Sequence, residues 1–155
     1  MKRAILWMLS AALAVACGAG VSAQDKPTFV GTWRTDMSRS RTGSGTVGPD
    51  QTITVEGHRM TIIQTTAGNS KSKVYMLDGS PSKDGETVYT SRWEGHVLVT
   101  TSSSSSGQFT EKRSMEPDGA MRVELTYQWS KVAIERRGPG APKGETFYRV
   151  YTKIK

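Results

Sequence analysis

Cysteine is almost absent from this 155-residue chain, since Cys17 is the only one and residues 24–155 contain none. That part of the chain therefore has no disulfide and no thiolate ligands for a metal. Histidine is scarce as well, with only His58 and His96. A metal site would need both histidines and the glutamates of the Glu-Gly pairs that precede them. Because Glu, Gly and His are also ordinary hairpin-turn residues, we expect no metal site.

Catalytic motifs are lacking too. None of the many serines lies in a Gly-x-Ser-x-Gly elbow, and no Walker-type or dinucleotide-binding glycine pattern occurs. The sequence therefore predicts no enzyme, no catalytic residues and no cofactor.

Long hydrophobic runs are confined to the N-terminus, where Met1–Arg3 is basic and residues 4–16 are apolar and uncharged. This run is shorter than the about 20 residues that a membrane-spanning helix needs. The small residues of Val21-Ser22-Ala23 then fit a signal-peptidase site. We interpret residues 1–23 as a cleaved secretory signal and residues 24–155 as a single domain, periplasmic or secreted.

Cys17 leaves a second interpretation of this segment open. The residues from Leu13 to Cys17 loosely match a bacterial lipobox, in which the cysteine is lipidated and becomes the first residue. Ala14 stands where such motifs usually have Leu, so export without a lipid is favoured. The alternative is an outer-membrane lipoprotein anchored at Cys17.

Blocks of like charge are missing from the chain. Its net charge is +7. Without Lys2 and Arg3 the 21 basic residues become 19, which against 14 acidic residues gives +5. The basic residues are scattered, with only short doublets such as Arg136-Arg137. A solvated surface is therefore favoured over a nucleic-acid partner.

Helical periodicity is absent after residue 23, and short β-rich runs take its place. In the clearest run, Met121–Trp129, every second residue is apolar and the residues between are polar, which is the pattern of a half-buried strand. Strands are predicted at Phe29–Thr35, Gln51–Glu56, Arg59–Thr66, Ser72–Asp78, Glu86–Trp93, His96–Ser103, Gln108–Met115, Met121–Trp129 and Glu145–Thr152.

Tight turns such as Asp84-Gly85 and Asp118-Gly119 join these runs into a meander. A meander of this length closes readily on itself, so the predicted fold is all-β, an antiparallel up-and-down β-barrel of eight to nine strands. Two connections, residues 36–50 and 136–144, are rich in Gly, Pro, Ser or Thr and are expected to be irregular loops.

Four short motifs occur in order along this meander. They are Gly31-x-Trp33, the hairpin Trp93–Val99, Glu116–Gly119 before the long alternating strand, and Tyr148–Tyr151 near the end. Together they resemble the lipocalin-like (calycin) barrels, in particular the small exported bacterial members.

The resemblance implies a structural pair that closes the barrel. In lipocalins the Trp of the first strand packs under an Arg of the last strand, and Trp33 and Arg149 match those positions. Such a cation–π contact contributes about 0.5–2 kcal/mol. This chain is too short to include the C-terminal helix of the larger lipocalins.

Two charged residues share a face of the strand Gln108–Met115. If its apolar ends, Phe109 and Met115, point inward, Glu111 and Arg113 point into the barrel as well. Buried charges are costly unless they are paired, so we hypothesise that Glu111 and Arg113 orient a bound molecule. The opposite register, with Lys112 and its neighbours Thr110 and Ser114 inward, is nearly as well supported.

The interior decides between two functions. Tyr127 and Trp129 are predicted on the inner face, where they either wall a pocket or plug it. A barrel of eight strands is just wide enough to fill with side chains or to hold one small ligand. The first function is binding of a small, mainly apolar or amphipathic ligand by an exported lipocalin-like protein. The alternative is a structural or protein-interaction module of the cell envelope with a filled barrel.

Overall fold

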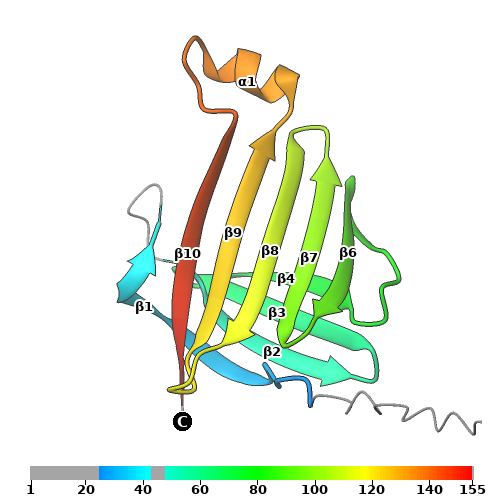
Figure 1. Ribbon diagram of the computed structural model, residues 1–155, viewed down its shortest axis with the longest axis vertical. Helices are drawn as coiled ribbons and strands as arrows, with labels where there is room; N and C mark the ends of the chain where they lie inside the picture. The colour runs from blue at the N-terminus through cyan, green and yellow to red at the C-terminus, as the bar shows by residue number, and fades with distance from the viewer. Residues whose placement is uncertain (1–24, 43–47, 155) are drawn as a thin grey trace, which may run out of the picture.

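The computed structural model describes residues 25–42 and 48–154. The expected signal segment, residues 1–23 with Cys17, lies outside these ranges. A single antiparallel sheet of ten strands curls into a nearly closed barrel (Figure 1), which confirms the predicted all-β antiparallel architecture. The strands are β1 (Gly31–Arg41), β2 (Asp50–Glu56), β3 (Arg59–Thr66), β4 (Asn69–Met76), β5 (Ser82–Asp84), β6 (Thr87–Glu94), β7 (Val97–Ser104), β8 (Gly107–Met115), β9 (Met121–Trp129) and β10 (Gly144–Lys153).

The sheet order is β4-β3-β2-β1-β10-β9-β8-β7-β6-β5. Neighbours in the sheet are neighbours in the chain everywhere except at β1 and β10, where the first and last strands pair and join the two halves of the barrel. The ends of the sheet, β4 and β5, meet at a seam. There the Ser82 hydroxyl donates a hydrogen bond to the backbone carbonyl of Val74, 2.5 Å away.

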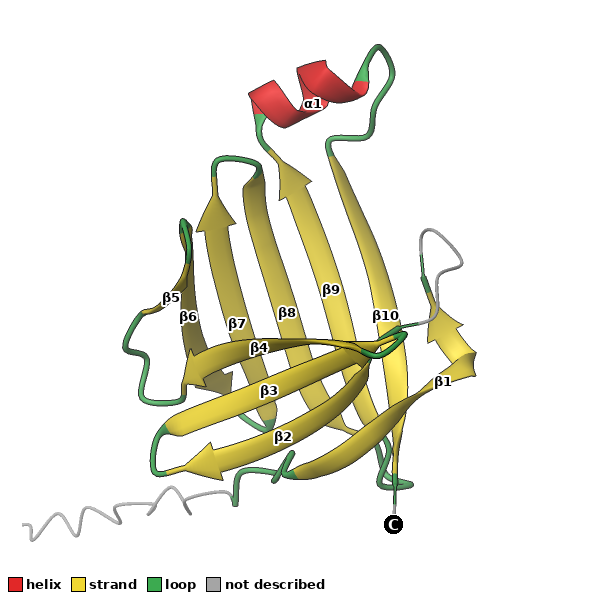
Figure 2. Cartoon of the chain, turned by 180° about the vertical axis from the view of Figure 1, so that it is seen from behind, coloured by secondary structure: helices red, strands yellow, loops and turns green. Residues whose placement is uncertain are grey.

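The two halves of the barrel cover each other only in part. Figure 2 shows β1–β4 crossing the lower portion of β6–β10, while β7–β10 continue past them. The single described helix, α1 (Lys131–Arg137), follows β9 at this far end. The inner face of the sheet is thus covered near the bottom and uncovered near α1.

Three local predictions are corrected. The sheet has ten strands, where eight to nine were predicted. The strand that was not predicted is the three-residue β5, which lies between Pro81 and Gly85 and pairs with β6. β1 continues to Arg41, into a segment expected to be a loop, and its pairing with β10 shifts register after Asp36 as at a β-bulge. The third correction is α1.

The helix α1 lies in a segment for which no helix was predicted, and local signals determine where it begins and ends. The Ser130 hydroxyl accepts a hydrogen bond from the backbone N–H of Ala133 at 3.2 Å, as an N-cap does. Arg136 and Arg137 occupy the last turn, and Gly138 ends the helix with φ 95°. The helix buries none of its residues, so it has no apolar stripe from which the sequence could predict it.

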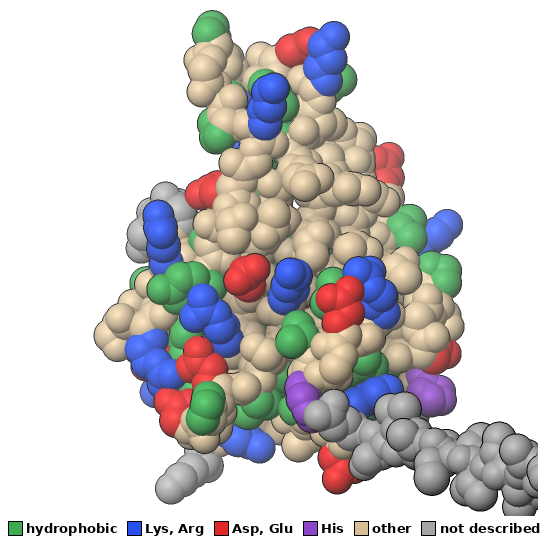
Figure 3. All heavy atoms as spheres, viewed as in Figure 1, with side chains coloured by type: hydrophobic (Ala, Val, Ile, Leu, Met, Phe, Trp, Pro, Cys, Tyr) green, Lys and Arg blue, Asp and Glu red, His purple; other side chains and the backbone are tan. Residues whose placement is uncertain are grey.

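Basic and acidic side chains intermingle on the outer face of the β6–β10 half, as Figure 3 shows, without a large area of one sign. Near α1 the same face consists mostly of uncharged polar groups and backbone. In the described ranges, no helix has the length and apolar character needed to cross a bilayer.

Candidate functional site

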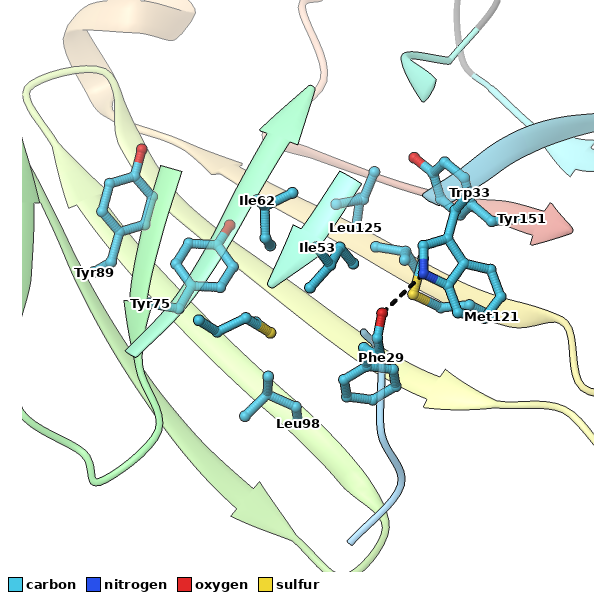
Figure 4. Close-up of a cluster of buried hydrophobic side chains, with 12 residues drawn as sticks. Phe29, Trp33, Ile53, Ile62, Tyr75, Tyr89, Leu98, Met121, Leu125 and Tyr151 are labelled. Atoms are coloured by element: carbon cyan, nitrogen blue, oxygen red, sulfur yellow. Dashed lines mark hydrogen bonds between the residues drawn. The ribbon is translucent and has the colours of Figure 1, made fainter. Parts of the chain in front are cut away.

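The lower part of the barrel is filled with side chains. Figure 4 shows the buried cluster, which combines aliphatic and aromatic residues from both halves. The Trp33 ring is 1% exposed, and its Nε1–H donates to the Phe29 carbonyl at 2.8 Å. Phe29 in turn stacks on Trp93 with ring centroids 5.9 Å apart. The segment before β1 therefore packs across this end of the barrel and closes it.

The cation over Trp33 is Lys153. Its Nζ lies 5.5 Å from the centroid of the Trp33 ring, and the two residues are directly opposed in the β1–β10 pairing. Arg149 is four residues away along β10, a separation of about 13 Å at the rise of a strand. The pairing of the first and last strands is as the resemblance implied, but the expected Trp33–Arg149 contact is wrong.

A buried ion pair lies above this cluster. Glu111 is 3% exposed and Arg113 is 0% exposed, while Lys112 between them is exposed. The inward register of Glu111 and Arg113 is therefore the one that the protein adopts. Their closest charged atoms, Glu111 Oε1 and Arg113 Nη2, are 2.7 Å apart.

Three more side chains extend this pair into a buried hydrogen-bond network, although the Arg113 Nε has no hydrogen-bond partner among the described residues. Arg113 Nη1 donates to Gln51 Oε1 at 2.9 Å, and Gln51 Nε2 donates to the Tyr151 hydroxyl at 2.9 Å. The Tyr75 hydroxyl donates to Glu111 Oε2 at 3.3 Å. The network joins β2, β4, β8 and β10 across the barrel, so it fixes how the two halves face each other.

Arg149 borders a cavity of about 240 Å³ next to this network. It lies on the inner face of β10 together with Phe147, whose ring centroid is 5.4 Å from the guanidinium carbon, and Tyr151. The Arg149 Nε is buried and has no hydrogen-bond partner among the described residues. The cavity is lined by Pro49, Gln51, Gln64, Lys73, Phe109, Glu111, Val123, Leu125, Tyr127, Arg149 and Tyr151.

The positive charge of Arg149 lies close enough to Tyr151 and Tyr127 to affect the pKa of both hydroxyls. Burial raises the pKa of the Tyr151 and Tyr127 hydroxyls, and in both cases the Arg149 charge opposes that rise. Glu111 acts in the opposite direction on both groups. Because Arg113 is already paired with Glu111, Arg149 and Lys73 supply the unbalanced charge along the cavity wall.

A second cavity of about 240 Å³ lies toward α1, and we call it the outer cavity. Tyr127 and Trp129, which were predicted on the inner face, both line it and neither is fully buried. It shares Lys73, Phe109 and Tyr127 with the cavity beside Arg149. The two spaces are therefore adjacent parts of one interior. Tyr127 and Trp129 wall that interior and do not plug it.

A third cavity, of about 290 Å³, lies at the opposite end of the barrel, where Phe29, Met60 and Trp93 are among its lining residues. The filled cluster separates it from Arg149. In residues 25–42 and 48–154, no group of three or more His, Cys, Asp or Glu side chains is placed to hold a metal ion.

The sequence does not predict several of the site residues. Gln51 and Tyr75 come from strands on the other half of the barrel, and the residues around them in the sequence do not indicate that they bond to Glu111 and Arg113. Arg149 was predicted to close the barrel and not to line a cavity. The two-residue period of Phe147, Arg149 and Tyr151 indicates that all three lie on one face of β10.

Comparison with solved structures places this arrangement in a known fold. Fatty-acid-binding protein 1 of Echinococcus granulosus superposes with a TM-score of 0.61 at 13% sequence identity, over 82% of this chain and 98% of that chain. The chain therefore shares the antiparallel barrel fold of that protein.

Two further barrels align over similar lengths. The REP1-NXSQ fatty acid transporter has a TM-score of 0.58 at 13% identity, over 81% of this chain and 96% of that chain. The fluorescent protein UnaG has a TM-score of 0.52 at 14% identity, over 81% and 97%. No protein-family model matches the sequence, and no curated protein sequence is significantly similar to it. At these identities the likeness concerns the fold.

Proposed function

We propose that this protein is a non-enzymatic binding protein that holds one small amphipathic acid inside its barrel. The observation that carries the proposal is the position of Arg149, which lines a cavity and takes part in none of the ion pairs among the described residues. Its neighbours Tyr151 and Gln51 add polar groups to the same wall.

Arg149 favours an anionic group on the ligand. A carboxylate in the cavity can accept charge-assisted hydrogen bonds from the outer nitrogens of the Arg149 guanidinium, and such bonds are about twice as strong as neutral ones. Glu111 does not supply that carboxylate, because its Oε1 is already held by Arg113 at 2.7 Å.

The remainder of the wall favours an apolar body. Phe109, Val123, Leu125 and Tyr127 line the same cavity, and burying apolar ligand surface contributes about 25 cal/mol per Å². Ligand sites in barrels are typically apolar with a few placed polar groups. The titles of two structural neighbours name a fatty-acid-binding protein and a fatty acid transporter, and their likeness in fold agrees with an amphipathic acid.

We also propose that the protein is exported and acts in the periplasm or outside the cell. The support is the basic, apolar and small-residue order of residues 1–23. Cys17 keeps a lipid-anchored form as the alternative.

The test compares an acid with its alcohol. The fluorescent probe 1-anilinonaphthalene-8-sulfonate is bound to the purified protein and then displaced by dodecanoate or by dodecanol. We expect dodecanoate to displace the probe at a concentration at least about tenfold lower, since a hydrogen bond to a charged group contributes about 1.5–3 kcal/mol. In Arg149→Gln this preference for the acid is lost.

Arg122→Gln is the matched control, because Arg122 lies on the outer face over the ring of Tyr148, at 3.9 Å. It should keep the preference. Equal displacement by acid and alcohol in the unmodified protein would reject the carboxylate role. Absence of binding by any of the three molecules would favour the structural or protein-interaction module with a filled barrel.

A further inference from the structure

The outer cavity is lined by an unusual combination of side chains. Its apolar surface comes from four aromatic residues, Tyr89, Phe109, Tyr127 and Trp129. The other described lining residues are Lys73, Thr87, Ser102, Ser104, Ser106, Gly107 and Gln108. Among these described residues there is no Ala, Val, Ile, Leu or Met, in contrast to the filled cluster below, which contains Ile53, Ile62 and Leu98.

Three of the four aromatic rings pack in a row, with Tyr127 in the centre and the Phe109 ring tilted by 41° against it. The Tyr127 centroid is 4.6 Å from that of Phe109 on β8 and 5.1 Å from that of Trp129, with which it is nearly parallel at 13°. On its β10 side, Tyr127 also stacks on Phe147, 5.6 Å away at 21°. The row continues from the outer cavity to Arg149, because Phe147 lies next to that guanidinium.

Arg137 holds the outer end of the row in place. Its guanidinium carbon lies 3.7 Å from the centroid of the Trp129 ring, so the last turn of α1 packs on the indole. The Trp129 Nε1 is buried and has no hydrogen-bond partner among the described residues. The indole is thus held between Arg137 and Tyr127, and it forms part of the lining of the outer cavity.

This lining suits a flat, conjugated ring better than a saturated chain. Aromatic pairs with centroids 4.5–7 Å apart gain about 0.5–1.5 kcal/mol beyond the area they bury, and a saturated chain gains only the area term. A saturated chain would also cover the serine and glutamine side chains without bonding to them, which costs free energy. Polar atoms at the edge of a ring can satisfy these groups.

We propose that the ligand is a planar aromatic acid, with its conjugated ring in the outer cavity and its carboxylate at Arg149. The inference rests on the proposed binding function and names the ligand class of the same interior. Lys73, Phe109 and Tyr127 line both cavities, so one elongated molecule can occupy both.

The test uses two acids that differ in the body they carry. 1-Pyrenebutyrate has a flat ring system and a carboxylate, and dodecanoate has a saturated chain and a carboxylate. Each is titrated against bound 1-anilinonaphthalene-8-sulfonate. We expect 1-pyrenebutyrate to bind at least about fivefold more tightly than dodecanoate, and Trp129→Leu to reduce that difference to less than about twofold.

Trp93→Leu is the matched control, because Trp93 lies at the opposite end of the barrel against Phe29. It should leave both affinities unchanged, which also excludes binding in the third cavity. If Trp129→Leu loses its near-ultraviolet circular dichroism, Trp129→Phe replaces it. That variant keeps a ring in the row and should retain part of the preference for 1-pyrenebutyrate.

The outcomes separate this inference from the function on which it rests. Tighter binding of dodecanoate, or equal weakening of both acids by Trp129→Leu, overturns the aromatic ligand class while the acid-binding function stands. Loss of both acids in Arg149→Gln supports the shared carboxylate position. If neither acid binds to the unmodified protein, both proposals fail.

Discussion

The Arg113 guanidinium and the Glu111 carboxylate form an ion pair 2.7 Å long inside the barrel, with 0% and 4% of their side-chain surfaces exposed. They are two residues apart on β8, so the strand itself holds them side by side on its inner face. Gln51 and Tyr75 then satisfy other atoms of the pair from the opposite half of the barrel.

Removing one member of this pair should be costly. Because the remaining charge would be buried without its partner, Arg113→Met or Glu111→Leu is expected to lower the free energy of unfolding by about 3–5 kcal/mol. The double variant should be more stable than either single variant, since it leaves no unpaired charge. Urea unfolding followed by circular dichroism measures all three. Additive losses in the double variant would show that the pair is not coupled.

The closing contact between β1 and β10 gives a second prediction. Trp33→Ala should cost about 3–5 kcal/mol, because a large buried side chain leaves a cavity. Lys153→Met should cost no more than about 1 kcal/mol, since it removes an exposed cation from the Trp33 ring and keeps its aliphatic stem. Arg149→Gln should not destabilise the protein through loss of a contact with Trp33, because Lys153 and not Arg149 lies over that ring. Thermal unfolding of the three variants would show a different order if Arg149 closed the barrel.

Gly107, the first residue of β8, tests a close backbone approach. Its φ is +139°, and a Cβ added there would collide with the backbone carbonyl oxygen of Gln128. Gly107→Ala should therefore destabilise the protein by clearly more than about 1 kcal/mol. Gly85→Ala is the matched control, because Gly85 also has positive φ (+58°) but has open space around its missing Cβ. Similar losses at both glycines would mean that backbone conformation alone matters.

Alkaline pH should destabilise the protein through Tyr75. Burial, together with the nearby Glu111 charge, raises the pKa of the Tyr75 hydroxyl well above 10. The folded state therefore favours the neutral phenol. This contribution to stability is complete below the unfolded-state pKa of about 10 and is lost as pH rises above it.

The measurement compares urea midpoints at pH 8 and pH 11 for the unmodified protein and for Tyr75→Phe. We expect the variant to lose less stability between the two values, because it has one fewer group that ionises only on unfolding. Absorbance at 295 nm follows phenolate formation directly. A folded protein in which all five tyrosines ionise near pH 10 would contradict the raised pKa.

The strands were predictable where local pattern determines them. Met121–Trp129 and Arg59–Thr66 begin and end where the alternation of apolar residues and the flanking turn residues indicated. The meander follows because tight turns join consecutive strands. By contrast, β5 and α1 are short and bury little, so neither leaves a periodic pattern in the sequence.

The site was predictable only in part, because it depends on how distant strands align. Glu111 and Arg113 were found from the inner face of one strand, and burial decided between the two registers. The partner of Trp33 was not predictable in the same way. Strands 120 residues apart had to be aligned, and the observed register opposes Trp33 with Lys153.

The seam between β4 and β5 also bears on how the protein behaves in solution. Open sheet edges offer backbone groups that can pair with another molecule, which leads to aggregation. Here one edge strand is only three residues long, and the other carries exposed or partly exposed lysines at positions 71 and 73. Short edges and charged side chains both discourage edge-to-edge association. The barrel can thus remain incompletely hydrogen-bonded around its circumference without its free edges becoming sites of self-assembly.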